Sequence, residues 1–288
     1  MKLGITTYYL NRYGIHAGAR RMRSHGYEYL DYQKFADVES GFFNLSEKNF
    51  EAEIKEDRKI IESEGIFVHQ AHGPWTYPTQ DSTPEERKLR FEFMSKAIRG
   101  TAYLGGRTMV IHPIMPFGAK SPENPEEMKK INFEFFSALC EVAGEYGIVI
   151  SYENMPFVDL PIHTARDVAD LARKINNDYF KVCLDTGHSI RCCEDLADAV
   201  RYIGKDLLYA LHVHDNMGDH DSHMLPGEGI GDFDALAAAL SDIEFDGVFS
   251  FETNPKIIEG DTAADIERKE LALADFGKKI INRGLLSI

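Results

Sequence analysis

Basic residues are scarce in this chain of 288 residues. It holds 32 Lys and Arg against 47 Asp and Glu, a formal net charge of −15 at pH 7. Broad binding to nucleic acid needs a basic face that neutralises phosphates, so the composition argues against a nucleic-acid partner. The acidic balance is instead typical of surfaces that keep a protein soluble.

Cysteines and long apolar runs are also few. Cys140, Cys183, Cys192 and Cys193 show neither disulfide nor zinc-site spacing, which favours a reducing compartment. The first residues, "MKLGITTYYLNRYG", lack the apolar core of a signal peptide. No window approaches the roughly 18 uninterrupted apolar residues of a membrane span. We therefore expect a cytoplasmic protein with no membrane partner.

Short apolar runs, rich in Val, Ile, Tyr and Phe, predict eight strands. They span residues 2–10, 27–33, 66–73, 108–113, 148–156, 181–188, 208–215 and 247–255. Helical patterns lie between them at residues 46–65, 82–106, 124–147, 164–176, 233–243 and 262–284. Alternating strands and helices imply a parallel sheet, and eight repeats at this length favour a closed (β/α)8 TIM barrel. No linker interrupts the pattern, which predicts a single domain over residues 1–288.

An open Rossmann-like sheet is the alternative fold. It would carry a glycine-rich phosphate loop after the first strand. The segment that follows the first strand reads "NRYGIHAGARRM", and its glycine pattern is too weak for such a loop. The barrel is therefore the expected fold.

Histidines and carboxylates gather where the predicted strands end. Ten of them lie at or near the C-terminal ends of six successive strands: His72, His112, Glu153, Asp185, His188, His212, His214, Asp221, His223 and Glu252. These strand ends form one rim of a TIM barrel, where active sites are built. A divalent cation requires nitrogen and oxygen donors that converge on one point. The sequence therefore predicts a metal site at this rim.

Three neighbouring residues have two plausible roles each. His214 shares a strand face with His212 and is either a metal ligand or a support for one. Asn154, beside Glu153, either holds the backbone or binds substrate. Trp75, the single tryptophan, is either a core residue or a hydrophobic wall of the pocket.

Four segments carry a resemblance that spans nearly the whole chain: "SYENMP", "CLDTGH", "LHVHDNMGDHDSHMLPGEG" and "FSFETNP". On these motifs the chain resembles the sugar phosphate isomerase/epimerase superfamily, the xylose isomerase-like TIM barrels that also include endonuclease IV. Together the motifs are specific for the superfamily, but none is specific for a substrate. Members are often dimers or tetramers, so a homo-oligomer is compatible with the resemblance.

The resemblance implies a metal set and a mechanism. The four ligands of the single divalent metal in the family's epimerases fall on Glu153, Asp185, His212 and Glu252. Zinc, manganese, cobalt or magnesium would suit this mixed set. The metal would stabilise an enediolate of a sugar, sugar phosphate or related polyhydroxy ketone. The catalytic residues Glu153 and Glu252 would remove and return a proton, and His188 matches a position that touches substrate oxygen.

The ligand pattern of endonuclease IV, which uses three zinc ions, is also complete. Its further positions fall on His72, His112, His188, Asp221 and His223, which is compatible with more than one metal per chain. A DNA-repair enzyme grips phosphates with basic loops, whereas the rim segments "TYPTQDSTPEE", "FGAKSPENPEE" and "MGDHDSH" are neutral or acidic. We therefore expect one metal, with these five residues contacting substrate or supporting the ligands.

Other activities share the same residues. Ketose 3-epimerases of the family usually carry an Arg shortly before a Leu-Pro-Gly turn, and "DSHMLPGEG" has none, which argues against a free-ketose 3-epimerase. A metal-dependent dehydratase of an inosose- or dehydroshikimate-like ketone is an alternative, as is a non-catalytic sugar-binding barrel. The complete ligand set favours an enzyme, and we expect an isomerase or epimerase with a small carbohydrate-like substrate.

Overall fold

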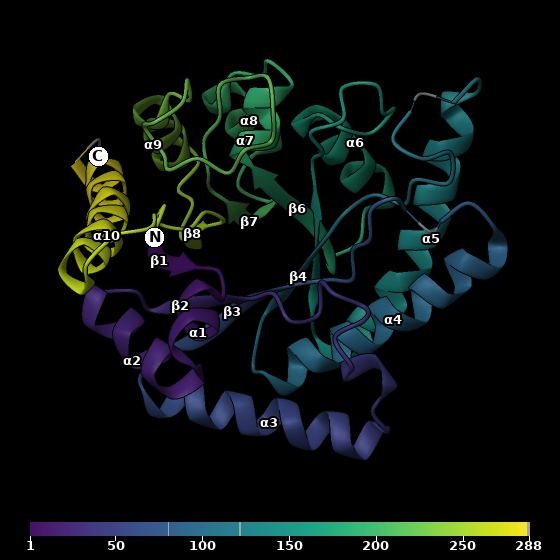
Figure 1. Cartoon of the computed structure of the whole chain (residues 1–288). Coiled ribbons are helices and arrows are strands. Elements are labelled where there is room, and N and C mark those ends of the chain that lie inside the picture. The colour runs from purple at the N-terminus through teal and green to yellow at the C-terminus, as the bar shows by residue number, and fades with distance from the viewer. Residues whose placement is uncertain (80, 121, 287–288) are drawn as a thin grey trace.

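Eight parallel strands form one sheet in the computed structural model, which describes residues 1–79, 81–120 and 122–286. The strands are β1 (Lys2–Ile5), β2 (Tyr29–Tyr32), β3 (Phe67–His72), β4 (Thr108–Ile111), β5 (Val149–Glu153), β6 (Phe180–Asp185), β7 (Leu208–His212) and β8 (Val248–Phe251). Their spatial order is β7-β6-β5-β4-β3-β2-β1-β8. From β1 to β7 each strand pairs with the next one along the chain, and β8 pairs with β1, so that β7 and β8 are the two ends of the sheet. Figure 1 shows the helices outside the strands.

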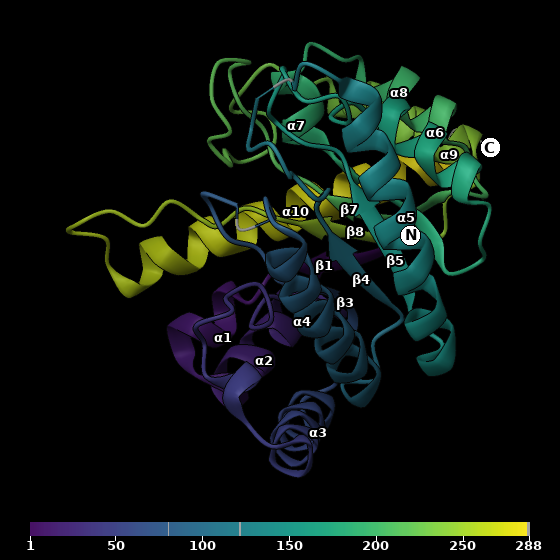
Figure 2. The same cartoon turned by 90° about the vertical axis from the view of Figure 1, so that its right-hand side faces the viewer.

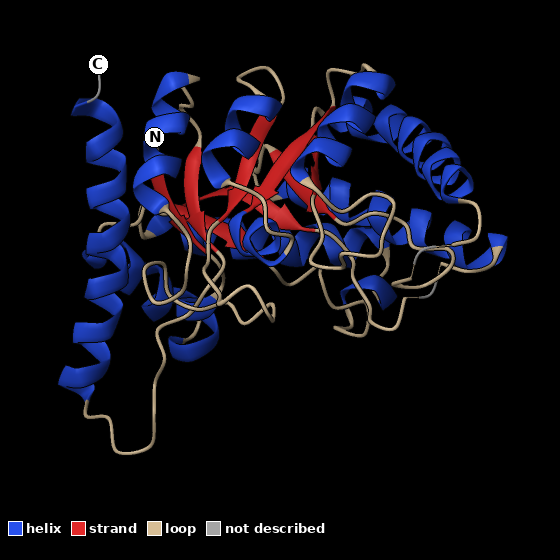
Figure 3. Cartoon of the chain, turned by 90° about the horizontal axis from the view of Figure 1, so that it is seen from above, coloured by secondary structure: helices blue, strands red, loops and turns tan. Residues whose placement is uncertain are grey.

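The sheet nearly closes on itself where β7 meets β8. The Val213 N–H donates to the Ser250 carbonyl at 2.9 Å, and the Glu252 N–H donates to the Val213 carbonyl at 3.1 Å. Both bonds lie at the C-terminal ends of the strands. The expected (β/α)8 TIM barrel is confirmed, and the strand ends form one rim. The connecting loops gather on one side of the strands in Figure 3.

The helices account for the expected patterns and add several short elements. They are α1 (Tyr8–Tyr13), α2 (Ile15–His25), the 3₁₀ turn η1 (Phe42–Asn44), α3 (Glu47–Ser63), α4 (Pro84–Tyr103), α5 (Pro125–Tyr146), α6 (Ala165–Ile175), α7 (Thr186–Arg191), α8 (Leu196–Ile203), α9 (Phe233–Asp242) and α10 (Ala263–Leu286). Local capping explains several helix starts. The Ser46 hydroxyl accepts from Asn49 N–H, and Thr83 with Glu86 forms a capping box at α4. Figure 2 shows the start of α10 extending away from the barrel.

All eight predicted strands are longer than the observed ones, and three of them show where the prediction fails. Residues 8–10 belong to α1 rather than to the first strand. The sixth strand ends at Asp185, because its carboxylate caps α7 by accepting from the His188 N–H at 2.6 Å. The seventh ends at His212, and the isolated bridge between Val213 and Phe251 follows it. The segment "NRYGIHAGARRM" contains the C-terminal end of α1 and most of α2. The sequence patterns did not predict these two helices.

The barrel interior contains buried polar side chains that contact one another. Thr108 Oγ1 lies 2.7 Å from Ser151 Oγ, and Gln70 Nε2 donates to Asp31 Oδ2 at 3.2 Å. All four side chains are buried. Buried polar groups in contact with one another form a fixed floor for side chains above them. In the described part of the chain, no helix is long and apolar enough to cross a membrane.

Candidate metal centre and active site

Four predicted side chains meet at the rim of the barrel. Glu153, Asp185 and His212 are the last residues of β5, β6 and β7, and Glu252 directly follows β8. One potential ligand atom of each lies within 4.8 Å of those of the other three. Glu153, Asp185 and His212 are fully buried, and the Glu252 side chain is 13% exposed. The parallel barrel thus brings together residues that are about a hundred positions apart in the sequence.

His212 is held between carboxylates on both sides of its ring. Nδ1 lies 2.8 Å from Glu153 Oε1 and 3.2 Å from Glu252 Oε2. Nε2 lies 2.9 Å from Asp31 Oδ2, an oxygen that also accepts from Gln70. Histidines that bind metals commonly donate their other ring N–H to a carboxylate, which fixes the tautomer. The geometry of His212 is therefore compatible with a metal ligand supported by Asp31.

His72 and His112 face the other oxygen of Glu153. Their Nε2 atoms lie 3.9 Å and 3.0 Å from Glu153 Oε2. Trp75 packs edge-on against His112, with the ring centroids 4.3 Å apart. His72, Glu153 and His212 form a second group with the spacing of metal ligands. One carboxylate thus links two candidate ligand groups.

A further group surrounds Asp221 in the β7–α9 loop. His188 Nε2 and His223 Nε2 lie 3.2 Å and 3.4 Å from Asp221 Oδ2. His214 Nε2 lies 3.0 Å from Asp185 Oδ2, and its ring stacks on His223 with centroids 4.0 Å apart. The structure therefore brings together every histidine and carboxylate predicted for the rim, and His214 contacts a candidate ligand rather than the pocket.

The charges of this cluster reinforce one another. Burial acts to lower the pKa of His188, but the neighbouring carboxylates outweigh it and raise this pKa to about 10. The same balance raises the pKa of His223 to about 9 and that of His212 well above its usual value. Burial opposes ionisation of Glu153, yet His212 and His112 hold its pKa well below the usual range. Without a metal, these carboxylates therefore favour the protonated forms of His188, His212 and His223, and a bound cation would displace such protons.

The residues fit a divalent cation. Glu153 Oε2 is buried and accepts no well-aligned hydrogen bond from a described residue, although His112 Nε2 lies 3.0 Å away. A buried carboxylate oxygen that lacks a hydrogen bond would gain from an additional positive group there. Two glutamates, one aspartate and one imidazole provide a donor set suited to zinc, manganese, cobalt or magnesium.

A cavity of about 360 Å³ lies over these residues. It is lined by Gln33, Ala36, His72, Trp75, Tyr77, His112, Met155, Pro156, Phe157, His188, Asp221, His223 and Glu252. Its size suits a small molecule, and it combines one polar side with an aromatic wall. Trp75 therefore forms part of that wall.

Asn154 has a structural role. Its side-chain oxygen accepts from the Asp185 N–H at 2.8 Å, and its amide group donates to the Asp185 carbonyl at 3.0 Å. It is fully buried and does not line the cavity. Of its two roles considered from the sequence, the geometry favours the one that holds the backbone.

Sequence patterns missed three residues that support the site. Asp31 contacts His212, and Gln33 Nε2 donates to Glu252 Oε1 at 3.0 Å. Asp215 accepts from the N–H groups of Gly227 and Gly229, both at 2.9 Å, and so anchors the β7–α9 loop. The acid in the apolar run "YLDYQ" was the available signal for Asp31, because a lone charge inside a buried strand requires a partner.

Comparison with known families agrees with this geometry. The profile of the "Xylose isomerase-like TIM barrel" family matches residues 19–274. The chain belongs to this family. An uncharacterised protein of Methanocaldococcus jannaschii, MJ1311, is 27% identical over 284 residues, which cover 96% of this chain and 91% of that protein.

Relatives with named activities match a smaller share of the chain. An inosose isomerase of Bacillus licheniformis is 27% identical over 44% of this chain and 48% of its own length. A probable endonuclease 4 of Mycoplasmopsis agalactiae is 25% identical over 66% of this chain and 69% of its own length. The family thus contains relatives named for two different reactions.

Solved structures share the fold at low identity. A D-psicose 3-epimerase, determined in the presence of D-fructose, has a TM-score of 0.78 and 19% identity, covering 98% of this chain and 99% of its own. The IolI protein with a bound zinc atom has a TM-score of 0.76 and 16% identity, covering 100% and 99%.

Proposed function

We propose that this chain is a divalent-metal-dependent isomerase or epimerase of a sugar, sugar phosphate or related polyhydroxy ketone. The observation that carries the proposal is the pair of carboxylates, Glu153 and Glu252, that both meet Nδ1 of His212, next to a cavity of small-molecule size that Glu252 lines. The names of the inosose isomerase relative and of the epimerase with a similar fold support the same class of substrate.

In this proposal, Glu153, Asp185, His212 and Glu252 hold the metal. When bound, the cation would stabilise negative charge that develops on a substrate oxygen beside the reacting carbon. One metal per chain is the simplest arrangement, with zinc, manganese, cobalt and magnesium all compatible with the ligands.

The two glutamates have different surroundings, which suggests different tasks. Glu252 lines the cavity, and Gln33 fixes its Oε1 while burial and the nearby imidazoles set its charge. The pKa of Glu252 is held below its usual value, chiefly by His212 acting against burial, so it is ionised and able to accept a proton. Glu153 is fully buried and contacts His212 through Oε1 and His112 through Oε2. We assign proton removal and return to this pair.

The remaining wall restricts what the substrate meets. Trp75, Tyr77 and Phe157 line the cavity, and the rings of Tyr77 and Phe157 stack with centroids 5.7 Å apart. His188 and Asp221 also line it and provide polar contacts. An apolar wall beside a polar one suits a polyhydroxylated carbon chain and limits access of bulk water.

Hydrolysis of a phosphodiester is the second candidate. It is favoured by the separate groups of candidate ligands that contain His72, Asp185 and Asp221, because these groups would accommodate more than one metal. A relative named as a probable endonuclease 4 adds to it. The acidic chain weighs against it, because binding DNA needs positive charge at the rim.

Metal content tests the shared premise. Elemental analysis of the purified chain should find about one divalent metal per chain. The double variant Glu153→Gln, Asp185→Asn should lose it. Two or three zinc ions would favour hydrolysis and direct the next assay to abasic-site DNA. Absence of metal under every loading condition would refute both metal-dependent activities.

Proton abstraction can then be tested before the product is known. Candidate ketoses, sugar phosphates and inosose-like ketones are incubated with the enzyme in deuterated water, and NMR follows exchange at the carbon beside the carbonyl. Exchange should require metal and be lost in Glu252→Gln. A dehydratase would instead release water and give an unsaturated product, and no exchange with any of these ketones would contradict the proposed class.

A further inference from the structure

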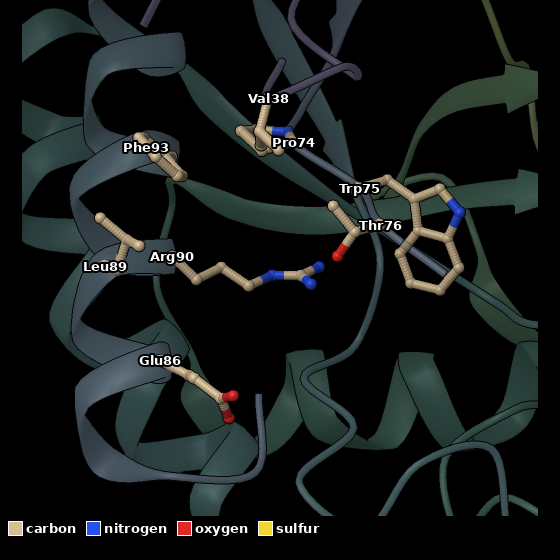
Figure 4. Close-up of a pocket in the computed structure, with 8 residues that line it drawn as sticks. All are labelled: Val38, Pro74, Trp75, Thr76, Glu86, Leu89, Arg90 and Phe93. Carbon is tan, nitrogen blue, oxygen red and sulfur yellow. The ribbon is translucent and has the colours of Figure 1, made fainter. Parts of the chain in front are cut away.

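A second, smaller pocket lies behind Trp75. Figure 4 shows it between α4 and the segment that follows β3, with the guanidinium of Arg90 reaching across it toward Thr76. Its walls are mostly apolar and are formed by Val38, Pro74, Trp75, Thr76, Glu86, Leu89, Arg90 and Phe93. The proposed reaction uses none of these residues except Trp75, which belongs to both pockets.

Arg90 has only one of its edges occupied. Its Nη1 lies 3.1 Å and 3.3 Å from the two carboxylate oxygens of Asp81. Arg90 is only 7% exposed, and its Nε and Nη2 atoms are buried. Neither atom has a hydrogen-bond partner among the described residues. Buried donors without acceptors are destabilising, so this free edge needs an acceptor, either solvent or a ligand.

The shape and charge of the pocket define that ligand. The Nε and Nη2 groups lie side by side on a planar guanidinium, an arrangement that matches the two oxygens of a carboxylate. The free space is about 40 Å³, enough for a small group but too little for a sugar ring. Arg87, which donates to the Asp81 carbonyl at 2.7 Å, places a second positive charge nearby and helps to offset Asp81 and Glu86.

We propose that this pocket, which we call the Arg90 pocket, binds a carboxylate group. The apolar walls favour a carboxylate attached to a short carbon chain over the more strongly hydrated phosphate ion. Trp75 connects the Arg90 pocket to the candidate active site, because its ring lies 5.8 Å from Arg90 Cζ and 4.3 Å from the ring of His112. The ligand is therefore either a free organic acid or the acidic end of a substrate. The second case rests on the proposed isomerase function.

The single tryptophan makes binding directly measurable. Trp75 fluorescence of the purified chain, with its metal, is titrated with butyrate, with uncharged butanamide and with inorganic phosphate at constant ionic strength. Butyrate should give a saturable change and butanamide should not. The butyrate titration is repeated after chelation, because binding to the Arg90 pocket should survive removal of the metal whereas binding to the metal would not.

Variants on the same helix provide the matched comparison. Arg90→Lys keeps a positive charge beside Asp81 but removes the two-donor edge, and should weaken butyrate binding by about tenfold or more. Arg99→Lys alters the surface pair with Glu47 and should have no effect. If Arg90→Lys were misfolded by circular dichroism, Arg90→Met combined with Asp81→Asn would replace it, since that pair leaves no buried charge unpaired.

Each outcome decides the matter. A saturable, metal-independent response that is lost with Arg90 supports the carboxylate site. No response, or one that Arg90→Lys retains, overturns it and assigns the free edge to water. An equal response to phosphate overturns the preference for carboxylate.

Turnover separates the two sources of the carboxylate. An acidic substrate would show a raised KM in Arg90→Lys with little change in KM for a neutral analogue, whereas a free acid would bind without competing with substrate. Because the fluorescence titration needs no turnover, failure of the proposed isomerase activity would leave the carboxylate site intact, and the reverse also holds.

Discussion

Asp31→Asn tests whether the carboxylate behind His212 prepares the metal site. In the structure, Asp31 Oδ2 faces His212 Nε2 at 2.9 Å, and both residues are fully buried. Gln70 donates to the same oxygen at 3.2 Å, which holds the carboxylate in place. An asparagine has nearly the same shape but replaces one oxygen with an amide group and removes the negative charge.

The expected loss follows from these contacts. With the charge gone, His212 Nε2 donates to a neutral amide oxygen, or the amide turns and favours the tautomer that carries its proton on Nδ1. Either change weakens His212 as a metal ligand through Nδ1. Removing such a supporting carboxylate typically lowers metal affinity by about 10- to 100-fold, or roughly 1.4–2.8 kcal/mol. The metal-free protein should lose little stability, because Glu153 and Glu252 still face the His212 ring and compensate its charge.

Two measurements together give a diagnostic pattern. Competition with a chelator reports metal affinity, and urea denaturation of the metal-free chain reports stability. Asp57→Asn is the control, because it makes the same substitution in a carboxylate that pairs with Lys34 and does not contact the candidate ligands. Metal affinity equal to that of the unmodified chain would refute the positioning role, and a matching fall in metal-free stability would assign Asp31 to folding alone.

Three further changes probe the site and the fold. Gly187→Ala should lower metal affinity by about tenfold in chelator competition, since a new Cβ would overlap the His214 ring. Glu270→Gln should reduce the free energy of unfolding by about 3 kcal/mol in urea denaturation, because the buried carboxylate accepts from Arg21 Nε at 2.6 Å. His69→Phe should reduce the acid sensitivity of folding. Burial lowers the pKa of His69 from 6.5 to about 4. The unfolded chain binds more protons in that window, so stability falls by roughly 2–3 kcal/mol as the pH drops through it. A urea midpoint that falls with pH as steeply in the variant as in the unmodified chain would contradict that reasoning.

The sequence predicts the barrel because each repeat carries its own local signal. Apolar runs mark the strands, and caps such as Ser46 and Thr83 mark helix starts. Strand ends are harder to predict, because they depend on contacts made in three dimensions. Asp185 ends β6 by capping α7, yet in the sequence it continues an apolar run. The rim ligands could be found because parallel strands place their C-terminal residues together. Asp31 carries only the signal of a charge inside an apolar run, which does not identify His212 as its partner. Asp215 binds backbone N–H groups, and such contacts leave no pattern of residue types in the sequence.

Asp215 also explains why the ligand-rich segment from Leu211 to Gly229 ends in glycines. Its carboxylate accepts from three backbone N–H groups in residues 227–231, so the loop folds tightly around one side chain. A Cβ at Gly229 would overlap that carboxylate, which makes glycine a requirement of the contact. The loop that carries Asp221 and His223 is therefore fixed to the barrel at its base.

The donors at this rim are preorganised by the fold, whereas the chemistry that they support depends on which substrates the outer walls admit. The Arg90 pocket behind Trp75 is part of that outer wall, so it is where specificity would be set without disturbing the metal ligands.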